Sequence, residues 1–464
     1  MREVYVLCAT LITSLLVVLA LVFTDDLTSF YIFSITEKLP IMLRLDGMGR
    51  IFAGLLAFLW PLAVSYSLEY MRHEGQENTF YTFYLITYGV TLGIAMSHNL
   101  ITMYSFYELL TLVTLPIVMH GMKEKNIRAG QKYVVYSIGG AAFAFIGIMA
   151  AFYYGGTTDF VYGGIFHSSM PSVAVGVIRF VYVLVFLGFG VKAAIFPLHG
   201  WLPAASVAPT PVTALLHAVA VVNCGAFAIM RVTYYIFGTE VLKNSWAQYL
   251  CVIMTAVTII FGSSMALKEQ HFKRRLAYST ISNLSYMLFG AALMSPMGLT
   301  GALSHFVFHG IIKITLFFVA GIVLVKYERA YVNDLFGFGR KMKLTFACFT
   351  IASLALMGVP PTIGFVSKWN LLTGAAFENS WTGYVGIAAI LVSALLTAMY
   401  LLSIVVKVYF PGPSFDSKTI EDVKDPGPLM TIPLIILTVT MILLGMFSNG
   451  LVSYIQKVGE GIIG

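Results

Sequence analysis

Apolar stretches about 20 residues long recur through the whole chain, and this recurrence limits the fold more than any other feature. Each such stretch has the length that a helix needs to cross a hydrocarbon core about 30 Å thick. Of the 464 residues, 59% are hydrophobic and 11% are charged, whereas soluble domains have about 25% charged residues. The sequence therefore predicts an all-α polytopic membrane protein.

Hydropathy indicates thirteen to fourteen membrane-spanning helices, of which thirteen can be given ranges. The first is expected to be an uncleaved span, because no small-residue cleavage site follows it. The predicted ranges are 4–23, 48–70, 80–97, 99–120, 131–154, 176–197, 210–236, 247–267, 275–294, 299–325, 344–374, 384–410 and 429–456.

The placement of basic residues predicts the orientation. When loops are assigned to alternate sides, most of the 28 Lys and Arg residues fall on one side, Lys273 among them. The other side has few, including Lys38 and Arg231. Because basic loops stay in the cytoplasm, we expect the N-terminus inside and the C-terminus outside. The net charge of +7 then indicates no nucleic-acid partner.

Two apolar stretches are interrupted by helix-breaking residues. Pro197 and Pro203 interrupt the first, and Pro360 and Pro361 interrupt the second. A proline removes a backbone donor and clashes with the preceding turn, so such breaks persist at membrane depth only beside protein or a water-filled cavity. Matching breaks in two halves are typical of transporters built from inverted repeats, although either break alone is equally consistent with an ordinary kink.

Glu108 lies in the middle of an apolar stretch, and Lys192 lies just before the first break. A charge near the bilayer centre costs about 2.5–3.5 kcal/mol on insertion scales, so an intramembrane carboxylate usually has a function and a partner. We predict that Lys192 is this partner and that the two groups exchange protons. The alternative is a static ion pair that fixes the register of two helices.

A second set of polar residues follows helical spacing. His305, His309 and Lys313 are four residues apart, which places them on one helical face over about 12 Å. Because the unperturbed pKa of histidine lies nearest neutrality, such a row can pass protons. His-x-x-x-His also occurs in metal sites, but no Glu or Cys lies nearby to complete one. Core histidines bonded to carbonyls are the other alternative for either one.

The remaining candidates complete a path. Lys368 follows the second break, and His217 and Asn223 lie between the two halves, where they are expected to connect other groups through water. The other histidines are expected to be solvated near loops: His73, His98, His120, His167 and His271. Four scattered cysteines form no Cys-x-x-Cys motif, so we expect no iron–sulfur cluster, metal or other cofactor.

Five ordered motifs, at 191–203, 208–217, 273–282, 305–313 and 360–368, resemble the proton-translocating antiporter family. That family supplies large membrane subunits of respiratory complex I, membrane-bound hydrogenases and Mrp sodium/proton antiporters. The resemblance implies two inverted five-helix repeats and a hydrophilic axis parallel to the membrane. By position, Glu108 resembles the family's access glutamate, Lys192 the lysine of the first broken helix and His217 a bridging histidine. His305, His309 and Lys313 resemble the groups between half-channels, and Lys368 the exit lysine.

The motifs are more similar to hydrogenase and Mrp D-type subunits than to mitochondrial ones. Asn223 departs from the pattern, because many relatives have a lysine there, and Ala204 stands where aspartate is frequent. The expected division is 1–75 for the N-terminal helices, 76–240 and 241–412 for the two repeats, and 413–464 for the C-terminal helix.

The expected function is translocation of H+, with Na+ as the alternative ion, beside other membrane subunits of a hydrogenase, complex I-like or Mrp complex. In that case the chain has no catalytic or redox site of its own. Other interpretations are a self-sufficient Na+/H+ antiporter, a haem b electron carrier that uses His217, His305 or His309 as ligands, and a scaffold that has lost transport.

Overall fold

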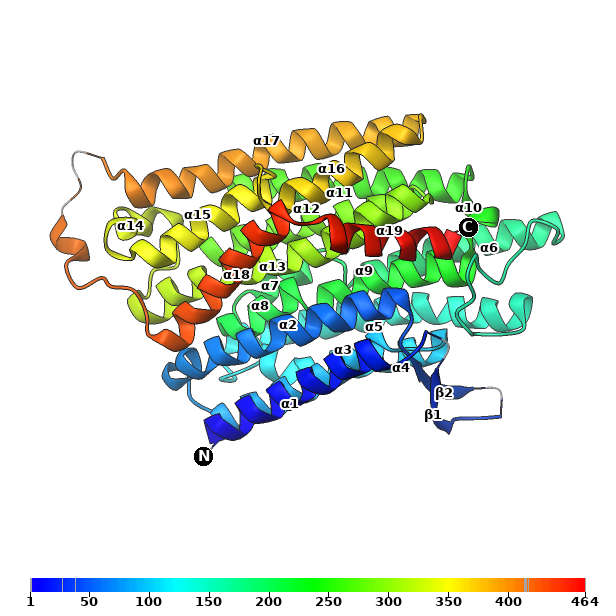
Figure 1. The fold of residues 1–464 in the computed structure, drawn as a ribbon, viewed down its shortest axis with the longest axis horizontal. Helices are drawn as coiled ribbons and strands as arrows, with labels where there is room; N and C mark the ends of the chain where they lie inside the picture. The colour runs from blue at the N-terminus through cyan, green and yellow to red at the C-terminus, as the bar shows by residue number, and fades with distance from the viewer. Residues whose placement is uncertain (1, 27, 38, 413–414, 416, 464) are drawn as a thin grey trace.

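The computed structural model describes the chain except residues 1, 27, 38, 413–414, 416 and 464, so Lys38 lies outside the described residues. Most helices lie side by side along the long axis of the molecule, and the two ends of the chain lie at opposite ends of that axis (Figure 1). The first half of the chain contains α1 (Arg2–Phe23), β1 (Ser29–Ser34), β2 (Pro40–Arg44), α2 (Gly47–Tyr70), η1 (Met71–His73), α3 (Glu77–Ala95), α4 (Leu100–Val118), α5 (Glu124–Ala150), η2 (Ala151–Gly155), α6 (Ser172–Gly190), α7 (Trp201–Ala205), α8 (Thr210–Ala218), α9 (Val221–Arg231) and η3 (Val232–Phe237).

The second half continues the bundle. It contains α10 (Thr239–Leu242), α11 (Trp246–Lys268), α12 (Phe272–Ala292), α13 (Pro296–Tyr327), η4 (Val332–Leu335), α14 (Phe338–Lys341), α15 (Lys343–Met357), α16 (Ile363–Phe377), α17 (Trp381–Tyr409), η5 (Ser417–Ile420), α18 (Pro428–Met446) and α19 (Asn449–Ile463).

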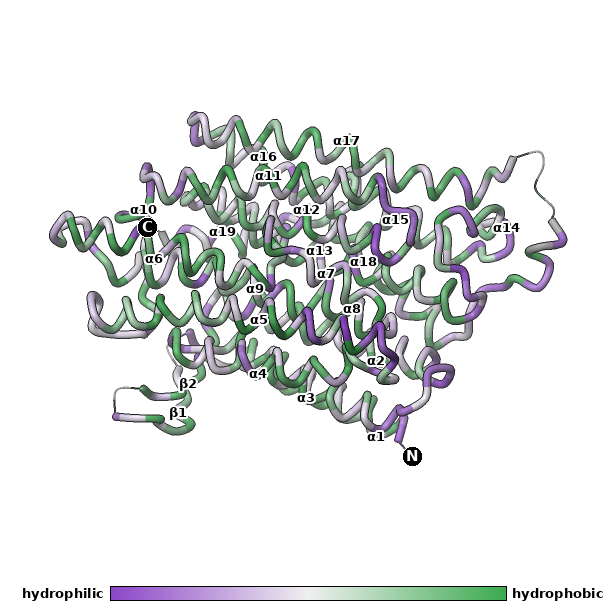
Figure 2. Tube along the Cα trace, turned by 180° about the vertical axis from the view of Figure 1, so that it is seen from behind, coloured by the Kyte–Doolittle hydropathy of each residue, from purple (hydrophilic) through white to green (hydrophobic). Residues whose placement is uncertain are grey.

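The predicted membrane-spanning helices are present. Ten described helical segments are long and apolar enough to cross a membrane, and the other predicted ranges coincide with α3, α12 and the pair α15/α16. Figure 2 shows hydrophobic residues along the long helices and hydrophilic residues mainly in the connections at their ends. The predicted all-α polytopic fold is therefore confirmed.

Short polar side chains fix where several helices begin. In each of five cases, a side-chain oxygen just before the helix accepts a hydrogen bond from a backbone N–H three residues later, which is the geometry of an N-cap. The capping residues are Asp46, Asn99, Ser245, Ser295 and Ser380.

Helix α13 forms the centre of the bundle. Every residue from Gly298 to Val323 is buried, because α2, α8, α12, α15, α16, α18 and α19 all pack against it. The opposite extreme is α1, whose most apolar window is only 22% buried. Polar side chains on α13 therefore contact protein and not lipid, which decides how the histidine row can act.

Both predicted breaks are non-helical in the structure. Between α6 and α7 the chain leaves the helix at Val191 and contains a cis peptide bond before Pro197, and Pro203 lies within the short α7. Between α15 and α16, Gly358 adopts φ +91° and the peptide bond between Pro360 and Pro361 is cis. The two breaks divide long apolar stretches into half-helices, as the prolines predicted.

Two predicted continuous spans are wrong. The range 210–236 is interrupted at Val219–Ala220, between α8 and α9, and the range 429–456 is interrupted between α18 and α19. Neither interruption contains a proline, and the first has no other strong local signal; the second adjoins Asn449-Gly450, a dipeptide typical of turns. Residues 29–34 and 40–44, which lie outside the predicted spans, form the antiparallel strands β1 and β2, with an irregular register between Tyr31 and Phe33.

The end of α18 packs against the second break through Gly445. A Cβ atom built there would lie 1.9 Å from the Pro361 carbonyl oxygen. We expect Gly445→Val to lower the free energy of unfolding by about 1–3 kcal/mol, the usual cost of overpacking. Thermal unfolding of the purified protein in detergent measures this. Gly450→Val is the matched control, since nothing lies within 4 Å of a Cβ there; equal stability of both variants would contradict the contact.

Candidate functional site

The first half of the candidate site joins α4 to the first break. Lys192 is completely buried; its ammonium donates a hydrogen bond to the Tyr107 carbonyl and lies 3.5 Å from the centroid of the Tyr107 ring. Such a cation over an aromatic face is favourable, more so when water is excluded. The backbone and ring of Tyr107 thus hold the ammonium.

The predicted direct Glu108–Lys192 ion pair is not formed. The half-buried Glu108 has a buried Oε1 atom without a hydrogen-bond partner, although its charge is close enough to Lys192 to interact through space. Successive residues on a helix point about 100° apart, so when Tyr107 faces Lys192, Glu108 points to the side. The two groups are neighbours without contact.

Asn223 lies at the unpredicted interruption between α8 and α9. Its side-chain amide donates a 3.0 Å hydrogen bond to the Ala218 carbonyl, while its buried Oδ1 atom has no partner. Nearby, a Cβ atom on Gly225 would lie 2.5 Å from the Ala193 nitrogen, so glycine allows α9 to approach the backbone beside Lys192. The start of α9, which follows the interruption at Val219–Ala220, therefore lies against the first break in the core.

His217 lies on α8, directly before that interruption. Its ring stacks on Phe317 with centroids 4.7 Å apart and an interplanar angle of 25°. It is completely buried, and neither ring nitrogen has a hydrogen-bond partner. Lys313 and Lys273 are close enough for their charges to act on it.

The row on α13 is formed as the spacing predicts. The rings of His305 and His309 stack with centroids 5.7 Å apart and an interplanar angle of 26°. His305 Nδ1 lies 3.0 Å from Ser367 Oγ on α16, and neither nitrogen of His309 has a partner. Lys313 donates to the Leu276 carbonyl at 3.1 Å and to Ser279 Oγ.

Lys368 closes the row at the second break. Its ammonium donates hydrogen bonds to the carbonyls of Leu356 at 2.7 Å and Met357 at 3.0 Å. These carbonyls end α15, where the break leaves them without helical partners. The negative end of the helix dipole also favours a cation there. The break therefore builds the binding place for Lys368.

The three buried ammonium groups share one property. Within the described residues, Lys192, Lys313 and Lys368 contact carbonyls, a hydroxyl or a ring, and none forms an ion pair with a carboxylate. A buried charge without a counter-ion is costly. Such a group is easily converted between ammonium and amine, and the unpartnered imidazole nitrogens beside it can accept or donate a proton.

A cluster of hydroxyl groups adjoins this row and was not predicted. Ser263, Ser282 and Ser393, on α11, α12 and α17, lie within 2.5–2.9 Å of one another. Tyr286 donates to Ser393 at 2.8 Å, and the ring of Tyr286 faces both His305 and Lys368. Ser282 ends the motif at 273–282, but Ser263 and Ser393 lie in apolar sequence without a motif, so only the packing reveals the cluster.

Three basic residues assigned to loops, Arg231, Lys273 and Arg275, are buried, and those assignments are wrong. Arg231 is completely buried and makes a two-pronged ion pair with Asp46. Lys273 is 2% exposed and donates a 2.6 Å hydrogen bond to the Ala208 carbonyl. His120 is also buried, contrary to expectation, with Nε2 lying 3.1 Å from the Gly75 carbonyl. Lys273 and His120 lie at or beside the ends of predicted spans, where sequence alone does not separate loop from core. Arg231 lies six residues before the end of the apolar segment Thr210–Phe237.

Comparison with known proteins agrees with the family resemblance that the motifs predicted. Residues 97–397 match the transmembrane family described as NADH:quinone oxidoreductase/Mrp antiporter, a range that contains every residue of the candidate path.

Curated relatives extend the similarity along the chain. The chain is 30% identical to NADH-quinone oxidoreductase subunit N of Desulforudis audaxviator, over 89% of this chain and 83% of that protein. It is 28% identical to an NAD(P)H-quinone oxidoreductase chain 4 of a Picosynechococcus species, over 79% of this chain and 66% of that protein. The chain thus spans about two thirds of the length of some of these relatives.

Solved structures show the same fold. A chain of an archaeal membrane-bound sulfane sulfur reductase has a TM-score of 0.88 at 22% identity, with 99% of this chain and 92% of that chain covered. A chain of the Mrp complex from a Dietzia species has a TM-score of 0.85 at 20% identity, with 100% and 92% covered. A chain of respiratory complex I from Thermus thermophilus has a TM-score of 0.81 at 21% identity, with 100% and 96% covered.

The motifs, the fold and the matched range agree, and the protein is a multi-pass, antiporter-like membrane subunit that belongs to the NADH:quinone oxidoreductase/Mrp antiporter family.

Proposed function

We propose that this chain translocates H+, with Na+ as the alternative ion, as one subunit of a multisubunit membrane complex. The host is a redox-driven pump of the hydrogenase or complex I type, or an Mrp antiporter, in a prokaryotic cell membrane. The observation that carries the proposal is the set of buried ammonium groups without carboxylate partners, Lys192, Lys313 and Lys368. Ionisable groups inside a membrane mark ion pathways in other proteins.

The order of the groups gives the proposed path. A proton binds the carboxylate of Glu108 and neutralises it. The negative charge that favoured the ammonium form of Lys192 is then lost, and Lys192 passes its own proton on. His217 and then the row of His305, His309 and Lys313 carry it across the core, and it leaves through Lys368. These transfers run through water between the groups that do not touch. The neighbouring subunits set the direction and supply the energy.

The two breaks support the proposed division into repeats 76–240 and 241–412. Lys192 lies at the break in the first, and Lys368 contacts carbonyls at the break in the second. The N-terminus is proposed to be cytoplasmic and the C-terminus external. Opposite sides for the ends agree with their positions at opposite ends of the bundle (Figure 1).

Glu108→Gln tests the start of the path. The amide keeps the shape of the carboxyl group but cannot take up a proton, so we expect the number of ions moved per turnover of the host complex to fall about tenfold, equivalent to about 1.4 kcal/mol in the barrier. The partner reaction should continue in part. Everted membrane vesicles with a pH-sensitive dye measure this ratio.

Glu240→Gln is the control, because that carboxylate lies on the short α10 and accepts hydrogen bonds from the exposed Ser168. We expect wild-type pumping from it. Wild-type pumping by both Glu108→Gln and Lys192→Ala would refute the proposed path and favour a scaffold. Sodium-driven loss of a pH gradient in liposomes that hold the purified chain alone would show instead a self-sufficient antiporter.

A further inference from the structure

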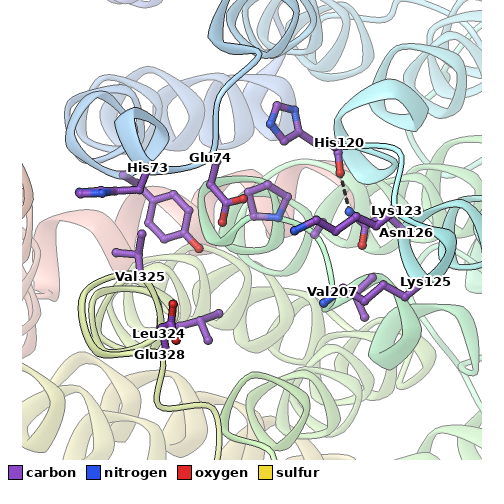
Figure 3. A pocket seen from close by; sticks show the side chains of 14 residues that line it. His73, Glu74, His120, Lys123, Lys125, Asn126, Val207, Leu324, Val325 and Glu328 are labelled. Atoms are coloured by element: carbon purple, nitrogen blue, oxygen red, sulfur yellow. Dashed lines mark hydrogen bonds between the residues drawn. The ribbon is translucent and has the colours of Figure 1, made fainter.

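A polar cavity of about 570 Å³ opens at the end of the bundle where the N-terminus lies. Its walls come from the α2–α3 connection, the α4–α5 connection and the end of α13. Figure 3 shows Lys123 and Lys125 extending into this space from the α5 side, with Glu74 on another wall. The titratable lining residues are Tyr70, His73, Glu74, His120, Lys123, Lys125 and Glu328. We call this space the vestibule.

The floor of the vestibule leads to a buried lysine. Ala208 lines the vestibule, and its carbonyl accepts the 2.6 Å hydrogen bond from Lys273. Lys273 itself is 2% exposed, and the charges of Glu74 and Lys125, both in the vestibule wall, act on it through space. One carbonyl group therefore lies between the vestibule and this ammonium.

The other side of Lys273 faces the candidate path. Lys273 stands in the first turn of α12, and the Leu276 carbonyl and Ser279 hydroxyl that hold Lys313 lie three and six residues further on. At 1.5 Å per residue, these positions are about 4.5 and 9 Å along the helix. The charges of both Lys273 and Lys313 act on His217 through space. Lys273 thus stands between the vestibule and the middle of the path.

We propose that the vestibule is a water-filled port and that Lys273 relays protons between it and the middle of the path. The ammonium of Lys273 gives one proton to the neutral imidazole of His217 or the neutral amine of Lys313. The resulting Lys273 amine then takes one proton from water in the vestibule. Only protons move, and the electron pairs stay on nitrogen. This inference rests on the proposed function and adds a connection to solvent at the centre of the path.

A cysteine in place of Lys273 tests both parts of the proposal. The host complex is kept intact in membrane vesicles, in a Cys8→Ser background, since the other native cysteines are buried. The reagent 2-aminoethyl methanethiosulfonate forms a disulfide with the new thiolate and releases methanesulfinate. The product ends in a primary ammonium, at about the reach of lysine. Its methyl analogue adds a group without charge.

We expect Lys273→Cys to lower ion movement per turnover about tenfold, a barrier change of about 1.4 kcal/mol. The aminoethyl reagent, added on the vestibule side, should restore most of it, and the methyl reagent should not. Lys313→Cys is the matched control for access, because that position is completely buried and lines no part of the vestibule. We expect neither labelling nor recovery there.

Each other outcome overturns a defined part. A Lys273→Cys variant that stays unlabelled refutes the port, and equal recovery with the methyl reagent assigns Lys273 to packing. Labelling with unchanged ion movement refutes the relay, provided that Glu108→Gln still fails to pump. If Glu108→Gln also pumps normally, the proposed function itself has failed. Should Lys273→Cys not assemble, Val207→Cys in the vestibule wall tests the port with Lys273 intact, and its failure to label from that side refutes it.

Discussion

Replacing Lys313 by methionine should nearly stop ion movement while the host complex keeps turning over. Methionine has similar length and flexibility but no proton to give, and the variant leaves the Leu276 carbonyl and the Ser279 hydroxyl without their donor. Because Lys313 lies where the α13 row meets α12, its loss separates the two halves of the path. We expect at least a tenfold fall in ions moved per turnover, or about 1.4 kcal/mol or more.

The measurement is dye-monitored pumping in everted vesicles, divided by the rate of the partner reaction in the same sample. Lys268→Met is the control: this exposed lysine ends α11, and its loss should leave the ratio unchanged. If Lys313→Met pumps normally while Glu108→Gln does not, the path is confined to the first half of the chain. His305→Ala should then also pump normally.

The sequence predicted the helices and the path residues for separable reasons. Apolar stretches of membrane length predicted the spans, and the prolines at 197 and 360–361 predicted the two breaks, because those residues act on the backbone locally. Helical periodicity was enough to place His305, His309 and Lys313 on one face. The structure places them in a stacked row on α13, which is buried from Gly298 to Val323.

Features that depend on distant contacts were not predicted. The interruption at Val219–Ala220 follows ordinary apolar residues, and its one local trace is Asn223, whose amide bonds the Ala218 carbonyl. Glu108 and Lys192 were expected to touch, but the ring and carbonyl of Tyr107 occupy the ammonium. Which of two adjacent helical residues faces a partner depends on helix rotation, and this is a property of packing.

The buried Arg231 is another residue whose contacts depend on packing and could not be predicted from the sequence. It lies six residues before the end of the apolar segment Thr210–Phe237, and its partner Asp46 is 185 residues away in the chain. Its guanidinium lies 4.6–5.1 Å from the ring centroids of Phe160, Phe227 and Tyr235. This aromatic cage over a buried ion pair predicts a structural role for Arg231 that hydropathy could not indicate.

Asp46→Asn should lower the free energy of unfolding by about 3–5 kcal/mol, the cost of leaving one partner of a buried ion pair uncompensated. The amide oxygen can still accept the hydrogen bond from the Gly49 nitrogen that caps α2, so the change removes the charge and spares the cap. Thermal unfolding of the purified protein in detergent measures the loss. Asp26→Asn is the matched control, because the Asp26 side chain is 51% exposed and its pair with Arg50 is open to solvent on that side; exposed pairs contribute about 0–1 kcal/mol.

The double variant Asp46→Asn with Arg231→Met separates charge from packing. Methionine fills much of the aromatic cage without a charge, and replacing a buried pair by apolar groups is often neutral, so the double variant should be more stable than Asp46→Asn alone. If the uncompensated guanidinium causes the stability loss of Asp46→Asn, the double variant must recover part of the free energy of unfolding. Ion movement per turnover should stay at the wild-type value, since neither residue lies on the proposed path. A double variant no more stable than the single one would mean that Asp46 acts through α2 and not through Arg231.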